Sequence, residues 1–438
     1  MPSPNPRTEE QIQEVGLHLY AAMRQELVGV TQAHRWETQV LRWCMKDPTL
    51  RTQILRFIDC LPSLESSRQI VEHLKEYFPE HRMRLPLPLR LGLLAARPAL
   101  FTQEAVAHVT RMTASAMARF FLAGANLEEA FQKIAQLESE GYRTSVDLLG
   151  EATVSQAEAD RYTRGYVELI EKWGATLPSA PHVSLKLSSL AFPFDPVDLK
   201  GAYAQVHPRL KKILQGTFRH SGFVNVDMEQ YHLRDLVLTL TERILKEEFP
   251  QETQVGVVIQ AYLKDSEQVT RGLLKWVNSR KVPITIRLVR GAYWDTEVIL
   301  SRQLGWPCPV YTTKRECDVS FERLTDLLFE HHEWVRIGIA THNLRSIARA
   351  IVKAKELQVP QDHWEVQLLY GMGQTLQRAV LKSGIPVRIY APIGELIPGM
   401  AYLVRRILEN TSHTSFVTMS LMEERDPDTL LESPHVSL

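Results

Sequence analysis

Apolar residues recur at every third or fourth position from residue 9 to about residue 141, as in Ile12, Val15 and Leu19. This spacing is typical of helices that bury one face. Six prolines between residues 48 and 98 mark places where such helices end. The pattern predicts six or seven helices and no strand in this part of the chain. We expect residues 1–141 to form a helical arm and linker domain that serves packing or oligomerisation.

After Gly141 the pattern changes, because short apolar runs rich in β-branched residues alternate with segments long enough for helices. Such alternation is typical of a parallel sheet whose strands are buried on both faces. Eight strand–helix units predict a (β/α)₈ barrel rather than a doubly wound open sheet, since no Gly-x-Gly-x-x-Gly follows the first run. The predicted strands are Thr144–Leu149, Val183–Leu190, Phe223–Met228, Val255–Ala261, Ile284–Val289, Val335–Ala340, Glu365–Leu369 and Val387–Tyr390, and the predicted last helix is Pro398–Asn410.

Composition narrows the class of protein. The 51 basic and 51 acidic residues cancel, so no overall field favours binding to nucleic acid. The 4 cysteines are scattered without a Cys-x-x-Cys pair, which argues against a disulfide scaffold or a structural zinc site. No uncharged apolar run reaches the ~18 residues of a spanning helix, and the first residues do not form a secretory signal. We expect a cytoplasmic protein without a metal, or one that meets a membrane only at its surface, on the inner face.

Polar residues gather where the predicted strands end. In a barrel of this class the active site lies at the C-terminal ends of the strands. A single polar residue in a buried strand is usually a satisfied core group, but a polar residue at the same end of every strand indicates a shared site. These residues are Asp147, Glu151, Lys186, Asp227, Glu229, Gln260, Arg287, Arg290, His342, Asn343, Gln367 and Tyr390.

The segment after the fifth predicted strand has the features of a cofactor contact. Arg287 ends an apolar run and keeps its charge, so it could hydrogen-bond an electron-rich atom such as a flavin N5. Gly291 and Ala292 remove side-chain bulk where a flat ring could approach. Tyr293 and Trp294 follow and could form a stacking surface.

Three further groups could carry chemistry. Arg405 and Arg406 are adjacent in an apolar helix, and arginine suits bidentate binding of a carboxylate. Thr312–Lys314 offers hydroxyls and a cation to a pyrophosphate. Lys186 is a lone cation in an apolar strand, which a Schiff-base lysine of a barrel aldolase would also be. Asp227 could be a metal ligand, an acid–base group or the partner of a buried cation.

Taken together, these residues resemble the proline dehydrogenase domain of the bacterial proline utilization A proteins over roughly residues 142–420. The helical region before it is similar to the arm and linker of those proteins, with less specific motifs. The motifs that carry the resemblance occur in the same order as in the family. They are Asp147–Glu151, Lys186–Ser188, Asp227–Glu229, Gln260–Tyr262, Arg287–Asp295, Thr341–Asn343, Gln367–Met372, Arg388–Pro392 and Tyr402–Asn410.

The resemblance implies a distorted barrel over residues 142–422 whose last helix lies across the strand ends. It also implies that FAD is bound without a Rossmann fold and that L-proline is oxidised to pyrroline-5-carboxylate, the first step of proline catabolism to glutamate. Hydride would pass to flavin N5 and the electrons to a membrane quinone. Relatives usually continue into an aldehyde dehydrogenase domain, so the tail at residues 423–438 is expected to end a monofunctional form or to be a linker in a longer bifunctional protein. A lysine-dependent aldolase and a barrel without turnover are the alternatives.

The resemblance also implies roles for individual residues. Arg405 and Arg406 would hold the proline carboxylate with Lys186 assisting, and Glu151 would orient Arg405. Arg287 would lie at flavin N5. The remaining residues are implied as sets: Asp227 and Gln260 near the isoalloxazine; Leu369, Tyr293, Tyr390 and Tyr402 around the substrate ring; and Met228, Val289, Gly291, Ala292, Trp294, Thr312, Thr313, Lys314, Thr341, His342, Asn343, Gln367, Arg406, Glu409, Ser412 and Phe416 along the rest of FAD.

Two positions refine the expectation. Arg290 stands where most relatives carry lysine, so the cation is kept and only local geometry should differ. Relatives that oxidise hydroxyproline tend to have a smaller residue at the position of Tyr390. The tyrosine should crowd a substituted ring, which favours proline as the substrate.

Overall fold

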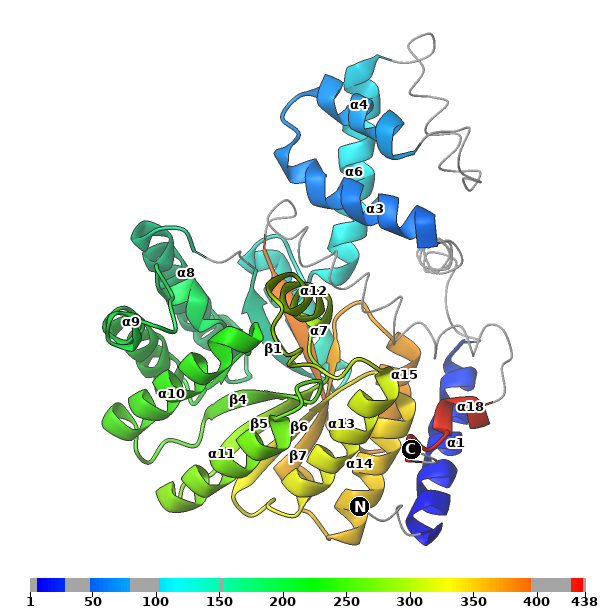
Figure 1. Ribbon diagram of the computed structural model, residues 1–438, viewed down its shortest axis with the longest axis vertical. Coiled ribbons are helices and arrows are strands. Elements are labelled where there is room, and N and C mark those ends of the chain that lie inside the picture. The colour runs from blue at the N-terminus through cyan, green and yellow to red at the C-terminus, as the bar shows by residue number, and fades with distance from the viewer. Residues whose placement is uncertain (1–5, 28–47, 79–101, 150–152, 395–426, 436–438) are drawn as a thin grey trace.

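The computed structural model describes residues 6–27, 48–78, 102–149, 153–394 and 427–435. Its centre is a closed barrel of eight parallel strands in sequence order, in which β8 pairs with β1 (Figure 1). This confirms the predicted (β/α)₈ fold. The strands are β1 (Arg143–Leu148), β2 (His182–Leu185), β3 (Phe223–Val226), β4 (Val255–Gln260), β5 (Ile284–Val289), β6 (Val335–Ala340), β7 (Trp364–Leu369) and β8 (Val387–Ile393).

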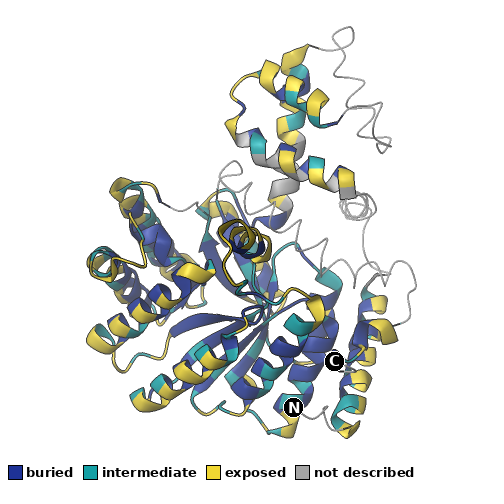
Figure 2. Ribbon diagram, in the orientation of Figure 1, coloured by how far each residue is buried: buried dark blue, intermediate teal, exposed yellow. Residues whose placement is uncertain are grey.

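Helices follow the strands and cover the outside of the barrel, so each strand is buried on both faces (Figure 2). This burial is why the strands read as nearly unbroken apolar runs: all six positions of β4 are buried. The helices from β1 onward are α8 (Gln156–Thr176), α9 (Leu199–Arg219), α10 (Tyr231–Glu248), α11 (Ser266–Arg280), α12 (Trp294–Leu304), α13 (Lys314–Phe329), α14 (Leu344–Glu356), α15 (Gln374–Lys382) and α18 (Asp428–Leu431), with short 3₁₀ helices at Leu187–Leu190 and Gln361–His363.

The second strand is shorter than predicted. Residues Leu187–Leu190 form a 3₁₀ helix, so the predicted strand Val183–Leu190 is wrong in its second half. The chain turns because the Ser189 backbone N–H and hydroxyl both donate to the Lys186 carbonyl, at 3.1 and 2.6 Å. Lys186 is therefore the last residue before the turn, at the mouth of the barrel.

The part of residues 1–141 that the structure describes is helical, as predicted. Its helices are α1 (Pro6–Leu27), α3 (Pro48–Cys60), α4 (Ser67–Tyr77), α6 (Gln103–Phe121) and α7 (Leu127–Ser139), with a 3₁₀ turn at Leu61–Ser63. Helices α3, α4 and α6 pack on one another to one side of the barrel (Figure 1). Helices α1 and α7 belong to the barrel instead, because residues such as Leu19, Met23 and Ile134 are part of its hydrophobic core.

A buried ion cluster ties α1 to the barrel. Arg345 of α14 is 4% exposed and pairs with both Glu9 of α1 and Glu322 of α13. The same guanidinium donates to the Leu431 carbonyl in α18 at 2.7 Å. Four segments from distant parts of the sequence thus meet at one side chain.

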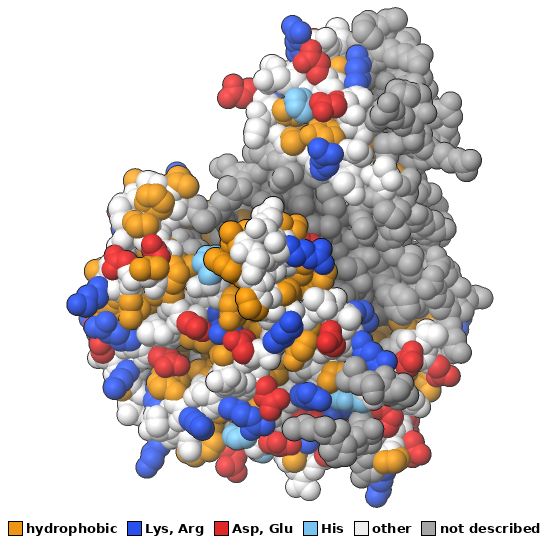
Figure 3. Space-filling model, in the orientation of Figure 1, with side chains coloured by type: hydrophobic (Ala, Val, Ile, Leu, Met, Phe, Trp, Pro, Cys, Tyr) orange, Lys and Arg blue, Asp and Glu red, His pale blue; other side chains and the backbone are white. Residues whose placement is uncertain are grey.

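The surface shows charges of both signs mixed over the barrel helices, with apolar side chains gathered over α12 (Figure 3). The exposed apolar residues there include Ile299, Leu304 and Trp306. Among the described helices, none is both long and apolar enough to cross a membrane.

Candidate functional site

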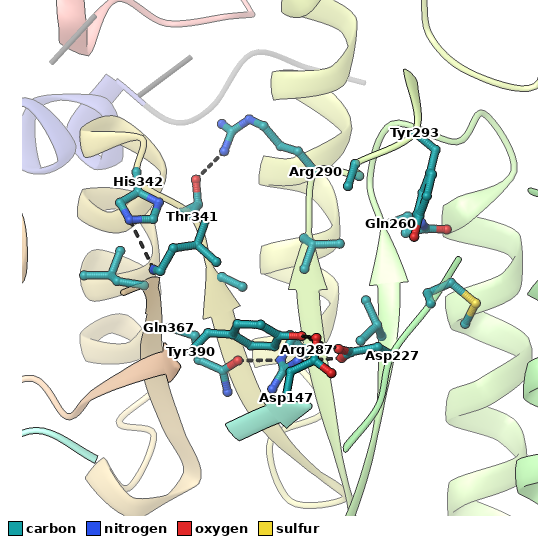
Figure 4. A pocket seen from close by; sticks show the side chains of 18 of the residues that line it. Asp147, Asp227, Gln260, Arg287, Arg290, Tyr293, Thr341, His342, Gln367 and Tyr390 are labelled. Carbon is teal, nitrogen blue, oxygen red and sulfur yellow. Dashed lines mark hydrogen bonds and ion pairs between the residues drawn. The ribbon is translucent and has the colours of Figure 1, made fainter. Parts of the chain in front are cut away.

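A cavity opens at the C-terminal ends of the strands, where the sequence predicted a site. Figure 4 shows Arg287, Asp147, Asp227 and Tyr390 meeting at the barrel centre, with Tyr293 and Gln260 on one side and Thr341 and His342 on the other. The described residues that line it are Asp147, Lys186, Asp227, Met228, Val258, Gln260, Arg287, Val289, Arg290, Gly291, Ala292, Tyr293, Ala340, Thr341, His342, Asn343, Gln367, Leu368, Leu369 and Tyr390.

Arg287 is fixed at the floor of this cavity before any ligand arrives. The residue is 4% exposed, and its guanidinium donates to residues on or just after three strands: Nε to Gln367 Oε1 at 2.6 Å, Nη1 to Asp227 Oδ1 at 2.7 Å and Nη2 to Ser184 Oγ at 3.0 Å. The guanidinium carbon also lies 5.3 Å from the centroid of the Tyr390 ring. Partners on β2, just after β3, and on β7 leave the guanidinium one orientation, so its charge is preorganised.

The Tyr390 hydroxyl links the two buried aspartates. It lies 2.7 Å from Asp147 Oδ2 and 2.8 Å from Asp227 Oδ2. Asp227 also accepts from Asn225 Nδ2 at 2.8 Å, and Asp147 accepts from the Lys186 ammonium at 3.1 Å. A continuous polar chain therefore runs from the Lys186 cation to the Arg287 cation.

The electrostatics around Lys186 keep it charged. Burial alone would lower its pKa, but the Asp147 and Asp227 carboxylates outweigh burial and raise the pKa above its ordinary value. A lysine that forms a Schiff base must be neutral when it attacks. The environment of Lys186 therefore opposes the aldolase alternative and suits a cation that binds an anionic group.

Glu229 and Gln260 flank the Asp227 side. Ser188 donates to Glu229 through its hydroxyl at 2.7 Å, and burial raises the pKa of Glu229. The Gln260 amide nitrogen donates to the Glu229 carbonyl at 3.0 Å. Its Oε1 is buried and has no hydrogen-bond partner among the described residues, so the cavity wall presents an unused acceptor.

A glycine opens the rim next to β5. Gly291 has φ +128°, a conformation that residues with a side chain rarely adopt. A Cβ at this position would lie 2.4 Å from the Tyr262 ring. The backbone after β5 can therefore lie directly against Tyr262.

Arg290 anchors the opposite wall. It donates to Asp318 Oδ1 at 2.7 Å, to the Ser346 hydroxyl at 2.9 Å and to the Thr341 hydroxyl. Beside it, the Leu369 backbone N–H donates to His342 Nε2 at 3.3 Å, so this ring nitrogen carries no proton. The arginine guanidinium holds these three partners, which lie on α13, on α14 and just after β6.

Four predicted cofactor residues lie away from the described lining. Trp294 begins α12, is 39% exposed and donates its indole N–H to the Tyr311 carbonyl at 2.8 Å. Thr312 is exposed, the Thr313 hydroxyl caps α13, and Lys314 pairs with Asp318 at 3.2 Å. Their contact with FAD stays a prediction.

Seven predicted site residues lie outside the described part of the chain. They are Glu151, Tyr402, Arg405, Arg406, Glu409, Ser412 and Phe416, and the predicted helix Pro398–Asn410 lies there too. The carboxylate clamp therefore stays a prediction. No group of three or more His, Cys, Asp or Glu side chains in the described ranges is arranged to hold a metal ion.

Three interior residues of the site were not predicted from the sequence. Ser184 and Asn225 each sit two positions before a predicted site residue and hydrogen-bond to the Arg287–Asp227 pair. Side chains two apart on a strand share a face, so this spacing was the signal that could have found them. Gly338 is the third, because it makes the space that the Gln367 side chain fills.

Gly338→Ala is therefore expected to lower the free energy of unfolding by about 1–3 kcal/mol. A Cβ would lie 2.6 Å from Gln367 Nε2, and that side chain is tethered at both ends, to Arg287 and to Glu365 Oε1 at 2.9 Å. Urea unfolding measures the change. Gly272→Ala is the matched control: Gly272 lies inside α11 with nothing within 4 Å of an added Cβ, so alanine there should stabilise slightly. Equal effects at both sites would contradict the packing argument.

The sequence matches two described families, proline dehydrogenase over residues 130–419 and the proline utilization A N-terminal domain over residues 9–121. The bifunctional protein PutA of Escherichia coli (strain K12) is 32% identical over 331 residues, which cover 73% of this chain and 25% of that protein. The proline dehydrogenase of Deinococcus radiodurans is 30% identical over 311 residues, or 70% of this chain and 90% of that protein.

Solved structures agree with these matches. The crystal structure of proline utilization A from Bdellovibrio bacteriovorus has a TM-score of 0.86 and 31% identity, and the match covers 98% of this chain and 44% of that one. The overall fold is thus shared with this relative. The chain belongs to the proline dehydrogenase family, and it spans about a quarter of the length of the bifunctional PutA relatives.

Proposed function

We propose that this chain oxidises L-proline to pyrroline-5-carboxylate with FAD, and that the electrons pass to a quinone. Membership of the family supports the reaction, since relatives that the chain covers almost entirely are named proline dehydrogenases. One solved relative is described as inactivated by N-propargylglycine, and another as having proline bound in remote sites. Compounds of this kind are amino acids with a carboxylate beside an amine.

The observation that carries the proposal is the arrangement of two cations around one cavity. Lys186 and Arg287 are joined through the Asp147–Tyr390–Asp227 chain, so both keep their charge and position. A substrate with one carboxylate and an apolar ring needs a cation, an aromatic wall and an electron acceptor at fixed places. Lys186 would bind the carboxylate, together with the predicted clamp of Arg405 and Arg406.

The residues at the cavity fit a flavin. The Gln260 Oε1 acceptor has no partner among the described residues, and an isoalloxazine ring carries an N–H that needs one. Gly291 lines the cavity and has no side chain that could obstruct a flat ring system. Arg287 offers a preorganised donor for an electron-rich ring atom. When bound, FAD would supply the acceptor for the hydride that leaves the carbon beside the proline nitrogen.

The protein's own part in this reaction is binding and orientation. Arg287 holds a positive charge in a buried site, where charge interactions are stronger than in water. The Tyr390 ring lies beside the Arg287 guanidinium in the cavity wall. There it would restrict the space around the substrate ring, which favours proline over a hydroxylated ring. Holding the reacting atoms in line contributes much of the rate enhancement of such sites.

A second enzyme activity would act on the product. The PutA relatives are named bifunctional, and this chain covers only about a quarter of them. In a longer polypeptide, or with a partner protein, an aldehyde dehydrogenase domain would oxidise the product onward to glutamate.

An anaerobic visible spectrum tests the proposal. The purified chain, reconstituted with FAD, is expected to show oxidised flavin absorption that bleaches when L-proline is added. The same addition of trans-4-hydroxyproline should bleach it far more slowly, because Tyr390 crowds the ring. A bound flavin that stays oxidised with proline would remove proline as the substrate, and a chain that takes up no FAD would remove the cofactor.

A further inference from the structure

A single carboxylate oxygen of Asp147 contacts two side chains of the cavity, Lys186 and Tyr390. Asp147 Oδ2 lies 3.1 Å from the Lys186 ammonium and 2.7 Å from the Tyr390 hydroxyl. The side chain is 2% exposed, whereas that of Lys186 is 25% exposed and reaches the cavity. The carboxylate belongs to the cavity lining but is almost fully covered, so it acts on a ligand mainly through the two groups that it holds.

Its other oxygen faces away from the cavity. The Tyr166 hydroxyl, from α8, lies 3.2 Å from Asp147 Oδ1 and 2.9 Å from the Ser184 carbonyl. Tyr166 is 1% exposed and is not part of the cavity lining. Asp147 Oδ2 therefore contacts groups of the cavity, whereas Oδ1 contacts the packed interior. The two sets of contacts can be removed by different substitutions.

The Tyr390 hydroxyl lies between two carboxylates. A phenol has one proton, yet the Tyr390 hydroxyl lies within 2.8 Å of a carboxylate oxygen on each side. Arg287 and Asn225 both donate to Asp227 Oδ1, so Asp227 Oδ2 and Asp147 Oδ2 share the Tyr390 hydroxyl. The contact with Asp147 Oδ2 is the shorter of the two, at 2.7 Å, so this carboxylate helps to set the orientation of the Tyr390 side chain.

We propose that Asp147 is a positioning residue that sets the Lys186 ammonium and the Tyr390 hydroxyl together through Oδ2. Asp147 then positions both Lys186, which would bind the substrate carboxylate, and Tyr390, which would lie against the substrate ring. The substrate part of this inference rests on the proposed function. The positioning of Lys186 does not, since it can be measured without proline or turnover.

Asp147→Asn is the main variant. An asparagine has almost the same shape, and its amide oxygen can still accept from both partners of Oδ2 while the amide nitrogen faces the Tyr166 hydroxyl. Only the negative charge is lost. The acids and phenols that face Lys186 are then Asp227 and Glu229 after β3, Tyr293 after β5, and Tyr390 on β8.

The first readout is the rate at which Lys186 is acetylated in the full chain at mildly alkaline pH, followed by mass spectrometry. Only the neutral amine reacts, so the rate should rise at least tenfold in Asp147→Asn, which is roughly the effect of one pKa unit. Tyr166→Phe is the control, because it removes a bond to the same carboxylate without touching Lys186. Tyr390→Phe leaves the Lys186–Asp147 pair intact, so Lys186 should react no faster than in the wild type.

The second readout is kinetic. Asp147→Asn should raise the KM for proline about tenfold and lower kcat less. In a double-mutant cycle with Tyr390→Phe the combined effect on KM should be smaller than the sum of the two, because the part that Asp147 exerts through Tyr390 is already lost.

Each outcome separates the two proposals. If the acetylation rate of Lys186 is unchanged in Asp147→Asn, or rises equally in Tyr166→Phe, the positioning role of Asp147 is overturned. This holds whatever the rate of proline oxidation. Additive effects on KM overturn the link to Tyr390. A wild-type chain that fails to oxidise proline while Lys186 still responds to Asp147→Asn would remove the proposed function and leave the positioning of Lys186 supported.

Discussion

Replacing Arg287 by methionine is expected to lower kcat for proline oxidation by roughly a hundredfold to a thousandfold, the usual effect of removing one preorganised donor from a site where charge develops. Methionine has a similar length but no charge. The loss should appear mainly in kcat, because Lys186 still binds the carboxylate. Stopped-flow reduction of the reconstituted flavin by proline measures it directly.

The same change should also destabilise the barrel. Asp227 is buried, and Arg287 is the cation that pairs with it at 2.7 Å. Removing one partner of a buried ion pair costs about 3–5 kcal/mol, part of which the Tyr390 and Asn225 hydrogen bonds to Asp227 should offset. Flavin content and urea unfolding must therefore be measured beside the rate.

Arg287→Lys is the matched variant, because it keeps the positive charge but loses the planar guanidinium with its several N–H donors. One ammonium cannot reach Gln367, Asp227 and Ser184 together, since these partners come from three different strand ends. We expect less loss of stability than in Arg287→Met, yet a kcat still well below the wild type. A lysine variant as fast as the wild type would show that charge alone, without fixed orientation, is enough. A methionine variant as fast would show that Arg287 has no part in the reaction.

Much of the barrel was predictable because burial on both faces leaves a clear mark on each strand. A strand such as β4 has no polar outer face, so its apolar run marks it directly. The end of β2 was not predictable in this way. Residues 187–190 continue the apolar run but turn into a 3₁₀ helix, because Ser189 captures the Lys186 carbonyl through a local hydrogen bond.

The site was predictable as a set of residues but not as a set of contacts. Strand ends placed Lys186, Asp227, Arg287 and Tyr390 at one mouth, and they do line one cavity. Which of them touch depends on barrel closure, which brings β8 beside β1 across more than 240 positions of sequence, as in the pair Tyr390 and Asp147. The sequence of one strand does not determine how it aligns with a strand so far away in the chain. The contacts of Asp147 with Lys186 and Tyr390 were therefore not predictable and are known from the structure.

A second large effect is expected at the ion cluster that joins α1 to the barrel. Arg345→Met should lower the free energy of unfolding by about 3 kcal/mol, the low end for breaking a buried pair, because Arg349 still pairs with Glu322 at 3.1 Å. Glu9 and the Leu431 carbonyl would lose their shared donor, so α1 and α18 should loosen first. Urea unfolding and limited proteolysis within α1 measure the two effects.

Arg271→Met is the matched control, since it removes the same side chain from an exposed pair. Arg271 and Glu267 lie one turn apart on α11 with side chains 53% and 38% exposed. Such pairs contribute roughly 0.3–0.5 kcal/mol. Equal destabilisation by the two variants would contradict the view that the Arg345 cluster holds α1 in place.

The pH dependence of stability gives an independent check on the same cluster. Burial opposes ionisation of Glu322, but His435 and the two arginines outweigh it and hold the pKa of this carboxyl below its ordinary value of 4.5. A depressed folded-state pKa means that the stabilisation is fully present above pH 4.5 and is lost as the pH falls through the folded-state value. Arg345→Met should bring that pKa back toward 4.5, so the variant should lose less of its remaining stability on acidification below pH 4.5 than the wild type does. Parallel pH curves for the two proteins would show that Arg345 does not influence the charge on Glu322.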